Sequence, residues 1–394
     1  MTGSTLNVLL TGGTGFLGKA VLARLVDEPR YDRIYLLVRP KQDQNATERV
    51  ATIVRRMFPK GRVESLLARI HAVPGDLTQT GLGIDPATLD ELALHVHQIL
   101  HLGASTDFGA PLNESRLNNV EGTRHVLDLA LHLKERGRLE RFDYVSTAYV
   151  SGKQRGRVSE LDLNRGQSFS NNYELSKFEA ELLVREYASR LNLAIYRPSI
   201  VVGDSMNGYT PHFKVLYWPL LLLAKNLLPF FTCNPRAYLD IVPVDYVANG
   251  LVVLMQRKES VGETFHLTAG LGSETRIREV LLDSYSLAGI KPRPIVPMWL
   301  FFAIRRSPFS RLFGSQFWRA VDMAKPYYDY LRGTGVRFDA TRTHAVLRPL
   351  GITPPRWREY KKEVLNYCLA SRWGRKVPIP EYVYYLPVSR VRGT

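Results

Sequence analysis

The stretch Val8-Leu9-Leu10-Thr11-Gly12-Gly13-Thr14-Gly15-Phe16-Leu17-Gly18 decides the fold of this chain. The apolar run at residues 6–10 predicts a buried parallel strand, and residues 19–26 have the apolar spacing of a helix. Glycines join the two elements: Gly12 permits a tight turn, Gly15 lets the backbone approach a pyrophosphate, and Gly18 lets the helix pack closely on the strand. Because free N–H groups at a helix N-terminus favour phosphates, the stretch predicts a dinucleotide-binding turn.

The composition is that of a large globular protein in a reducing compartment. Of its 394 residues, 45% are hydrophobic and 23% are charged, which suits two domains or one large α/β domain with an appendage. The two cysteines, Cys233 and Cys368, are too few for a disulfide framework or a cysteine metal site. We expect free thiols, a cytoplasmic location, and no secretory signal peptide before the strand that begins at Leu6.

Positive charge is concentrated in the last third of the chain. The formal net charge is +16, and residues 271–394 hold 22 Lys+Arg against 9 Asp+Glu, a net of +13. This excess favours an anionic partner: a phosphorylated ligand, an acidic carrier protein or a lipid headgroup surface. Because the chain carries no nucleic-acid-binding motif, we expect no nucleic-acid partner.

Apolar runs and helical patterns alternate through the first two thirds of the chain. This alternation predicts an α/β fold, with a doubly wound parallel sheet and right-handed crossovers. After residue 205 the pattern changes, and we expect a smaller, mostly helical C-terminal region. The expected strands are residues 6–10, 34–38, 70–73, 98–102, 142–145, 193–196 and 240–247, and the expected helices are residues 19–26, 45–70, 117–133 and 171–189.

The second expected strand ends in basic residues, Arg39 and Lys41. An acidic residue at this strand end holds the ribose 2′-hydroxyl in NAD-preferring folds, whereas a basic residue suits a 2′-phosphate. The two residues therefore favour NADPH over NADH, with solvated surface charge as the alternative. After the third strand, Asp76 could accept from the adenine amino group and Leu77 could pack on the adenine ring. Gly103, after the fourth strand, leaves space for a cofactor above the sheet.

Three histidines, His95, His97 and His101, lie near one another in the sequence. Zinc sites usually combine histidines with cysteines or carboxylates, and neither clusters with these three. We therefore expect no metal site.

Two apolar and aromatic segments, residues 213–231 and 295–304, follow the predicted sheet. Lysines and prolines interrupt the first segment, so a membrane-spanning helix is not expected there. The second segment is followed by Arg305 and Arg306, a combination typical of helices at a membrane interface. An acyl-chain pocket, a lid, a peripheral membrane contact and ordinary core packing all fit these segments.

Tyr173 and Lys177 lie four residues apart on an expected helix, so both side chains leave the same face. A tyrosine with a pKa of about 10 is a poor acid–base catalyst at neutral pH, and a nearby lysine ammonium lowers that pKa. Thr147, or alternatively Ser146, ends a strand where its hydroxyl can orient a substrate carbonyl. The set predicts carbonyl reduction, with a proton from tyrosine and a hydride from a nicotinamide, and the alternative is a surface Tyr–Lys pair.

Four motifs occur in order: Thr11-Gly12-x-x-Gly15-x-x-Gly18, Asn119-Val120-x-Gly122-Thr123, Ser146-Thr147-Ala148 and Tyr173-x-x-x-Lys177. Together they resemble the extended short-chain dehydrogenase/reductase family. The stretches TGGTGFLGK (11–19), IYLLVRPK (34–41), VSTAYV (145–150), RPSIV (197–201) and IVPVDYV (241–247) look like fatty acyl-CoA reductases and related thioester reductase domains. This likeness covers residues 6–270, and residues 336–339 and 357–360 look more loosely like the helical C-terminal region of acyl-CoA reductases.

The resemblance implies an NAD(P)-binding reductase domain over residues 1–270 and a basic helical C-terminal region over residues 271–394. It implies that Thr147, Tyr173 and Lys177 are catalytic, that NADPH is the cofactor, and that Asn119 supports Lys177, directly or through a water. From the motifs and the resemblance together, the expected cofactor-binding residues are Thr11, Gly12, Thr14, Gly15, Phe16, Leu17, Gly18, Arg39, Lys41, Asp76, Leu77, Gly103, Asn119, Tyr173, Lys177, Pro198, Ser199 and Ile200.

The function that the resemblance implies is NADPH-dependent reduction of a long-chain fatty acyl thioester, carried by coenzyme A or an acyl carrier protein. Hydride attack gives a hemithioacetal oxyanion for Thr147 and Tyr173 to stabilise and protonate. Loss of the thiol gives an aldehyde, and a second reduction gives a primary alcohol. The basic last third would steer the coenzyme A phosphates or the carrier protein. The alternatives are an epimerase or dehydratase, a sterol-type dehydrogenase, and a non-enzymatic NADP-binding sensor or scaffold.

Overall fold

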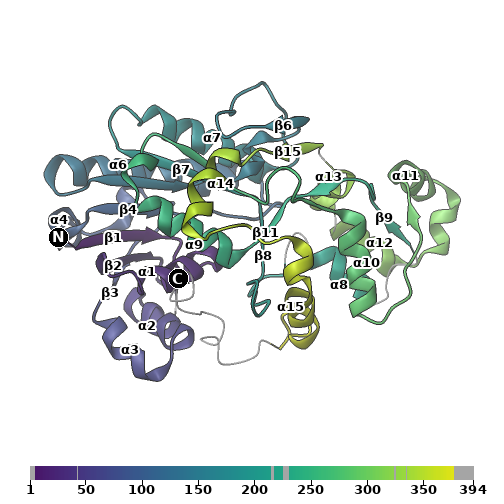
Figure 1. Cartoon of the computed structure of the whole chain (residues 1–394), viewed down its shortest axis with the longest axis horizontal. Helices are drawn as coiled ribbons and strands as arrows, with labels where there is room; N and C mark the ends of the chain where they lie inside the picture. The colour runs from purple at the N-terminus through teal and green to yellow at the C-terminus, as the bar shows by residue number, and fades with distance from the viewer. Residues whose placement is uncertain are drawn as a thin grey trace.

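The computed structural model describes residues 5–41, 43–213, 217–224, 230–323, 325–333 and 335–376. Its centre is a seven-stranded parallel sheet with helices on both faces (Figure 1). The strand order reverses between β1 and β4, which is where sheets of this class bind ligands. In sheet order the strands are β12 (Thr264–Leu267), β7 (Leu193–Pro198), β5 (Arg141–Val145), β4 (Gln98–His101), β1 (Leu6–Thr11), β2 (Tyr31–Val38) and β3 (Ile70–Pro74).

The sheet separates two apolar cores, and this explains the continuous apolar runs of its strands. Val8 and Leu10 of β1 belong to one core, whereas Leu9 between them belongs to the other. Helices α1 (Phe16–Leu25), α2 (Ala46–Met57), α3 (Lys60–Leu67) and α9 (Val244–Met255) contribute to the first core. Helices α4 (Pro86–His95), α6 (Gly122–Arg136) and α7 (Asn172–Glu186) contribute to the second.

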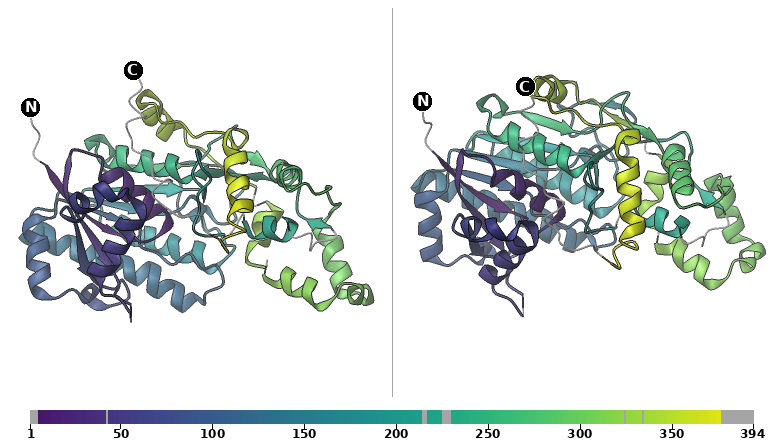
Figure 2. Two further views of the ribbon diagram at one scale, coloured as in Figure 1. Left: turned by 90° about the horizontal axis from the view of Figure 1, so that it is seen from below. Right: turned by 60° about the horizontal axis from the view of Figure 1, so that its bottom comes forward.

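A third apolar core joins the loop after β7 to the C-terminal helices. Short parallel pairs connect the two parts of the chain: β8 (Ile200–Val202) pairs with β11 (Ile241–Pro243), and β6 (Gly156–Val158) pairs with β15 (Val336–Phe338). The views in Figure 2 place α11 at the end of the molecule that is farthest from β1, β2 and β3. The remaining α-helices and β-strands of the described residues are α5 (Leu112–Arg116), α8 (Tyr217–Ala224), β9 (Phe231–Thr232), β10 (Tyr238–Leu239), β13 (Thr275–Arg276), α10 (Ile277–Leu287), β14 (Ile295–Val296), α11 (Met298–Arg306), α12 (Ser315–Met323), α13 (Tyr328–Arg332), α14 (Thr341–Leu347) and α15 (Trp357–Ala370).

The predicted fold class is confirmed, and the differences have physical reasons. The strand predicted at residues 240–247 is wrong beyond Pro243, because Val244 begins α9. This helix is buried on nearly every side, so its apolar residues follow one another without helical spacing. The helix predicted at residues 45–70 is two helices, since Pro59 precedes α3.

The apolar segments after the sheet form short elements. Within residues 213–231 the structure shows α8 and the start of β9, and residues 214–216 and 225–229 lie outside the described residues. The segment 295–304 forms β14 and most of α11. In the described part of the chain, none of the helices combines the length and the apolar character that crossing a bilayer requires.

Candidate active site

The glycine turn after β1 is shaped as the sequence predicts. Gly12 has a φ of +72°, and a Cβ there would lie 2.7 Å from the backbone nitrogen of Gly103. A Cβ on Gly18 would lie 2.1 Å from the carbonyl oxygen of Gly12. Helix α1 then begins after Gly15, with no acidic residue in its first turn. The turn is therefore tight, closed to side chains and able to receive a pyrophosphate on free N–H groups.

A cavity of about 500 Å³ lies over this turn and extends along the carboxyl edge of the sheet. Its volume is typical of cofactor and ligand sites. It brings together the ends of β1, β4, β5 and β7 with one face of α7. The predicted site residues that line it are Gly12, Thr14, Gly15, Phe16, Leu17, Gly18, Thr147, Tyr173, Lys177, Pro198, Ser199 and Ile200.

Tyr173 and Thr147 are neighbours in the lining of this cavity. The Tyr173 ring stacks on Phe108 with a centroid distance of 5.3 Å. Desolvation raises the pKa of Tyr173 to about 12, and a hydrogen bond with Thr147 opposes that rise. The lowered tyrosine pKa that we predicted is therefore wrong for this arrangement, because desolvation outweighs the neighbouring polar groups. A phenol with such a pKa stays protonated at neutral pH and can donate a proton.

Lys177, one helical turn after Tyr173, is buried against β5. Its Nζ donates to the Tyr144 hydroxyl at 2.8 Å and to the Val145 carbonyl oxygen at 2.9 Å. Burial lowers the pKa of Lys177 to about 7, although the Glu181 carboxylate acts in the opposite direction. The ammonium is thus held in one place and titrates near neutrality. Our sequence reasoning missed Tyr144, because nothing local to β5 indicates which of its residues meets α7.

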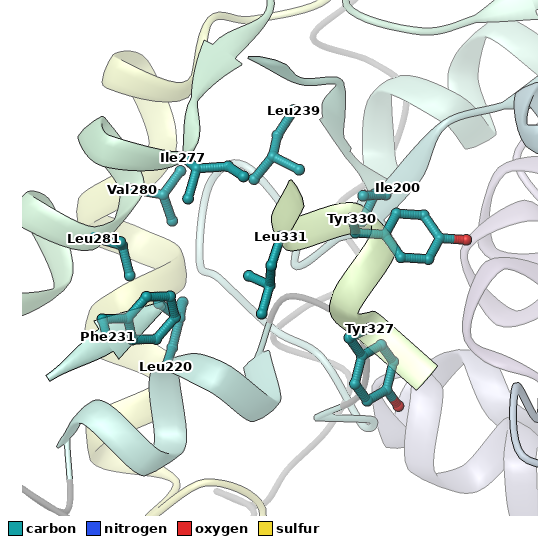
Figure 3. A pocket seen from close by; sticks show the side chains of 10 residues that line it. All are labelled: Ile200, Leu220, Phe231, Leu239, Ile277, Val280, Leu281, Tyr327, Tyr330 and Leu331. Atoms are coloured by element: carbon teal, nitrogen blue, oxygen red, sulfur yellow. The ribbon is translucent and has the colours of Figure 1, made fainter. Parts of the chain in front are cut away.

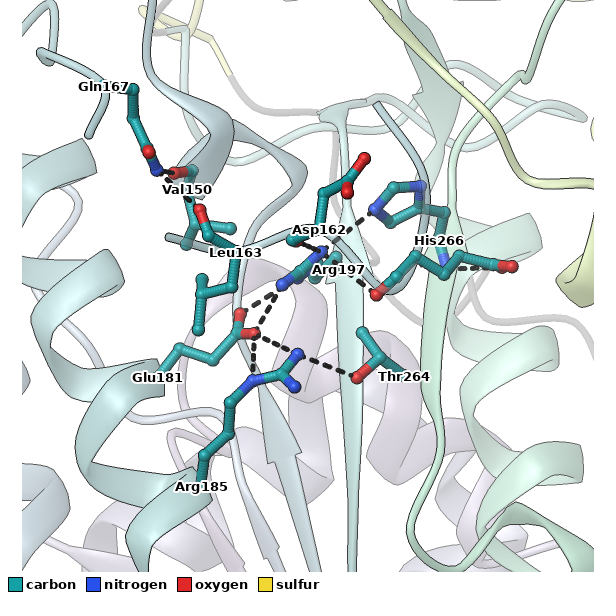
Figure 4. A network of polar contacts seen from close by, with 10 residues as sticks. Val150, Asp162, Leu163, Gln167, Glu181, Arg185, Arg197, Thr264 and His266 are labelled. Carbon is teal, nitrogen blue, oxygen red and sulfur yellow. Dashed lines mark hydrogen bonds and ion pairs between the residues drawn. The ribbon is translucent and has the colours of Figure 1, made fainter. Parts of the chain in front are cut away.

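A buried ion pair fixes α7 against β7 (Figure 4). Arg197 donates from Nη2 to Glu181 Oε1 at 2.6 Å and from Nε to Oε2 at 3.0 Å. Burial opposes ionisation of Glu181, but the charge of Arg197 outweighs it and lowers the Glu181 pKa to about 2. Glu181 follows Lys177 by one helical turn, and Arg197 directly precedes Pro198. The pair therefore holds α7, which carries Tyr173 and Lys177, against the cavity wall at Pro198. The sequence signal that could have indicated Glu181 is its position four residues after Lys177, which repeats the spacing from Tyr173 to Lys177.

Thr11, Gly103 and Asn119 are predicted site residues that do not line the cavity. The Thr11 hydroxyl contacts His101 Nδ1 at 2.6 Å and accepts from the Gly103 backbone N–H at 3.1 Å. Asn119 accepts from the Ser105 N–H at 2.7 Å and donates to Ser105 and to the Ser176 hydroxyl. These contacts join β1, β4 and α7 under the site, and the Asn119 amide reaches the residue before Lys177.

The residues predicted to bind the adenosine half lie at the ends of β2 and β3. Arg39 exposes 65% of its side chain, and its Nη1 lies 3.6 Å from Asp76 Oδ2. Asp76 also accepts from the backbone N–H and the hydroxyl of Thr78 at 3.0 and 2.9 Å. Leu77 lies against Gly103, where a Cβ on the glycine would be 2.6 Å from the leucine side chain. Lys41 is exposed beyond Arg39.

Comparison with known proteins identifies the family. The family model described as Male sterility protein, an NAD-binding family, matches residues 10–251. Fatty acyl-CoA reductase 1 of Homo sapiens is 30% identical over 275 residues, which are 62% of this chain and 53% of that protein. Fatty acyl-CoA reductase 2 of Homo sapiens is 27% identical over 407 residues, which are 91% of this chain and 77% of that protein. The chain spans about half the length of most of these curated relatives.

One solved structure has a similar fold over nearly the whole length of this chain. The crystal structure of the terminal R domain from the myxalamid PKS-NRPS biosynthetic pathway has a TM-score of 0.79 and 28% identity, and it covers 96% of this chain and 94% of that chain. The glycine turn, the cavity and the family match together define an NAD(P)-binding domain. The chain therefore belongs to the Male sterility protein family of extended short-chain dehydrogenases/reductases, which includes proteins named fatty acyl-CoA reductases.

Proposed function

We propose that this protein is an oxidoreductase that uses NADPH to reduce a long-chain fatty acyl thioester to an aldehyde or onward to a primary alcohol. The observation that carries this proposal is that one and the same cavity is lined by the glycine turn and by Thr147, Tyr173 and Lys177. The names of the relatives support an acyl thioester as the substrate class. The acyl group could be carried by coenzyme A or by an acyl carrier protein, because both are anionic and the last third of this chain is basic.

The lining of the cavity suits the pyrophosphate and the nicotinamide end of a dinucleotide. The glycine turn would hold the pyrophosphate, and the cavity wall of Pro198, Ser199 and Ile200 would border the nicotinamide. When bound, the cofactor supplies a hydride to the carbonyl carbon of the substrate. Lys177 would hold the nicotinamide ribose, and its position in the cavity lining supports this role.

The substrate oxygen is the atom on which the chain's own groups act. Thr147 would orient the thioester carbonyl through its hydroxyl, and Tyr173 would donate its phenolic proton as negative charge develops on that oxygen. The product of this addition is a hemithioacetal. Its carbon–sulfur bond then breaks, the thiol leaves with a proton, and the aldehyde remains for release or a second reduction.

The test is turnover of palmitoyl-CoA by the purified protein with NADPH, with the products extracted and identified. Aldehyde or alcohol formed in proportion to NADPH oxidised supports the proposal, and the product distinguishes two-electron from four-electron reduction. Bound NADPH without product from acyl-CoA or acyl carrier protein thioesters contradicts it. Turnover of a nucleotide sugar or a sterol would instead favour one of the alternative enzymes.

The preference for NADPH is proposed to depend on Arg39. Its ion pair with Asp76 is exposed, so it contributes little to stability and is easily exchanged for a 2′-phosphate. We expect Arg39→Ala to raise the Kd for NADPH about tenfold and to leave the Kd for NADH unchanged. The variant loses a charge-assisted hydrogen bond to the 2′-phosphate, and NADH has no such phosphate. Fluorescence titration with both cofactors measures this. Equal weakening of both cofactors would show that Arg39 does not recognise the 2′-phosphate.

We also propose a peripheral contact with an anionic membrane surface at the end of the molecule where α11 lies (Figure 2). Trp299, Phe309 and Leu312 are 72%, 68% and 78% exposed there, beside the exposed Arg306 and Arg311. Apolar side chains interleaved with arginines are typical of interfacial segments.

Substituting these apolar side chains tests the membrane contact. A Trp299→Ser/Leu312→Ser double variant is expected to lose most of its co-sedimentation with phosphatidylserine-containing vesicles. Leu161→Ser is the matched control, because Leu161 is 71% exposed but lies in the sheet-bearing part of the chain. Equal sedimentation of all three proteins would contradict the contact.

A further inference from the structure

A second cavity lies beside the candidate active site, and its walls are almost wholly apolar (Figure 3). Its volume is about 40 Å³, room for roughly three water molecules. Leu220 of α8, Phe231 of β9, and Val280 and Leu281 of α10 form its far wall. In Figure 3 the hydroxyl groups of Tyr327 and Tyr330 point away from that wall. A water molecule here would find few polar partners, so the cavity suits an alkyl group.

The two cavities share a wall. Ile200 and Tyr330 line both of them, so among the described residues these two side chains belong to the boundary between the apolar cavity and the site of Tyr173. The Tyr330 hydroxyl donates to Glu174 Oε1 at 2.6 Å, and Glu174 is the neighbour of Tyr173. Phe108 stacks on both tyrosine rings, at 5.3 Å from Tyr173 and 5.8 Å from Tyr330. The junction between the cavities is therefore anchored to the reacting end of the site.

An apolar void of this kind is unfavourable unless something fills it. Protein interiors are close-packed, and side chains around a void lose their dispersion contacts on that side. Val280 and Leu281 are 1% and 3% exposed, so the protein buries them around this space. A ligand that enters from the active site must pass Ile200 and Tyr330 and must be slender and apolar at its leading end.

We infer that this cavity receives the methyl end of the substrate's acyl chain and that Val280 and Leu281 limit the chain length. The inference rests on the proposed function, because it needs a substrate whose reacting carbon lies at Tyr173 and whose chain continues past Tyr330. It adds a specificity-determining site that is formed by α8, β9 and α10, outside the NAD(P)-binding motifs.

The test compares palmitoyl-CoA with octanoyl-CoA for a variant that fills the cavity. We expect Leu281→Phe to lower kcat/KM for palmitoyl-CoA at least about tenfold while leaving octanoyl-CoA nearly unchanged, because lost methylene contacts in an apolar pocket have effects of this size. Leu282→Phe is the matched control: the next residue of the same helix is 41% exposed and outside the cavity. It is expected to leave both substrates unchanged.

A second variant keeps the inference testable if Leu281→Phe does not fold. Leu281→Ala enlarges the cavity and is expected to shift the preference toward chains longer than palmitoyl. Circular dichroism and thermal unfolding establish that each variant is folded. If the folded Leu281 variants keep the wild-type ratio of palmitoyl to octanoyl turnover, the inference is overturned.

Direct binding separates this inference from the proposed function. Wild-type protein is expected to bind the fluorescent fatty acid cis-parinaric acid, with at least tenfold weaker binding in Leu281→Phe and unchanged binding in Leu282→Phe. That result without any thioester turnover would retain the cavity assignment and reject the proposed function. Thioester turnover with an unchanged chain-length preference in the Leu281 variants would retain the proposed function and reject the cavity assignment. The absence of both turnover and binding would reject the proposed function and the cavity assignment together.

Discussion

Tyr173→Phe is expected to lower kcat for thioester reduction by about 10²–10⁴-fold and to leave the Kd for NADPH unchanged. The substitution removes only the phenolic oxygen, so the ring stacked on Phe108 keeps its place and the cavity keeps its shape. The pKa of Tyr173, raised to about 12, keeps the phenol protonated at neutral pH. The lost group is therefore the proton donor, and the effect falls on the chemical step.

The measurement is single-turnover reduction of palmitoyl-CoA, with NADPH binding determined in parallel. Tyr187→Phe is the matched control, because Tyr187 ends the same helix and its hydroxyl contacts Asp128 at 3.2 Å rather than the cavity. It is expected to retain wild-type turnover. Wild-type turnover by Tyr173→Phe would assign the proton donor to another group, and NADPH binding with no turnover in the wild-type protein would favour the sensor or scaffold.

The parts of the site that the sequence predicts are those formed by neighbours along the chain. The glycine turn can be recognised from a strand, three glycines and a helix that follow one another in the sequence. The relation of Tyr173 to Lys177 can be recognised from their spacing of one helical turn. Most strands of the central sheet can be predicted from the sequence, because both faces of the sheet are buried and each of these strands is therefore a continuous apolar run. The same rule misled us at α9, where burial on nearly all sides produced a strand-like run.

The parts that we missed depend on contacts between distant segments. The strand β12 is four residues long and contains His266, so nothing in its sequence indicates that it completes the sheet beside β7. The apolar cavity combines residues from Ile200 to Leu331, and only the folded chain brings them together. The pKa of Tyr173 was mispredicted because desolvation, which is a tertiary effect, exceeds the local effect of helical spacing.

Arg197→Met is expected to lower the free energy of unfolding by about 3 kcal/mol, because it leaves a buried carboxylate without its main partner. Arg197 and Glu181 have side chains that are 1% and 0% exposed. Arg197 also donates to the Asp162 carbonyl oxygen at 2.8 Å, so its loss leaves a second acceptor with one contact fewer. Because Arg197 immediately precedes Pro198, we expect a lower kcat as well, through displacement of the cavity wall.

The pH dependence of the loss identifies its cause. In the wild-type protein the Glu181 pKa is lowered to about 2, so its stabilising effect is present above its ordinary pKa and is lost as pH falls toward 2. In Arg197→Met, Arg185 remains as a cationic partner, but burial is expected to hold the Glu181 pKa well above its wild-type value, so much of the stabilisation at neutral pH is lost. The difference between the two proteins should therefore shrink as pH falls from 7 toward 4.

Urea unfolding at both pH values measures this difference, and two further variants separate charge from packing. Glu181→Met/Arg197→Met removes both charges and is expected to recover most of the lost stability, since apolar replacement of a buried ion pair is often neutral. Arg185→Met removes the more exposed partner of Glu181 and is expected to cost less than about 1 kcal/mol. If Arg197→Met were as stable as the wild-type protein at pH 7, the pair could not be what holds α7 against β7. The positions of Tyr173 and Lys177 would then depend on the apolar packing of α7 alone.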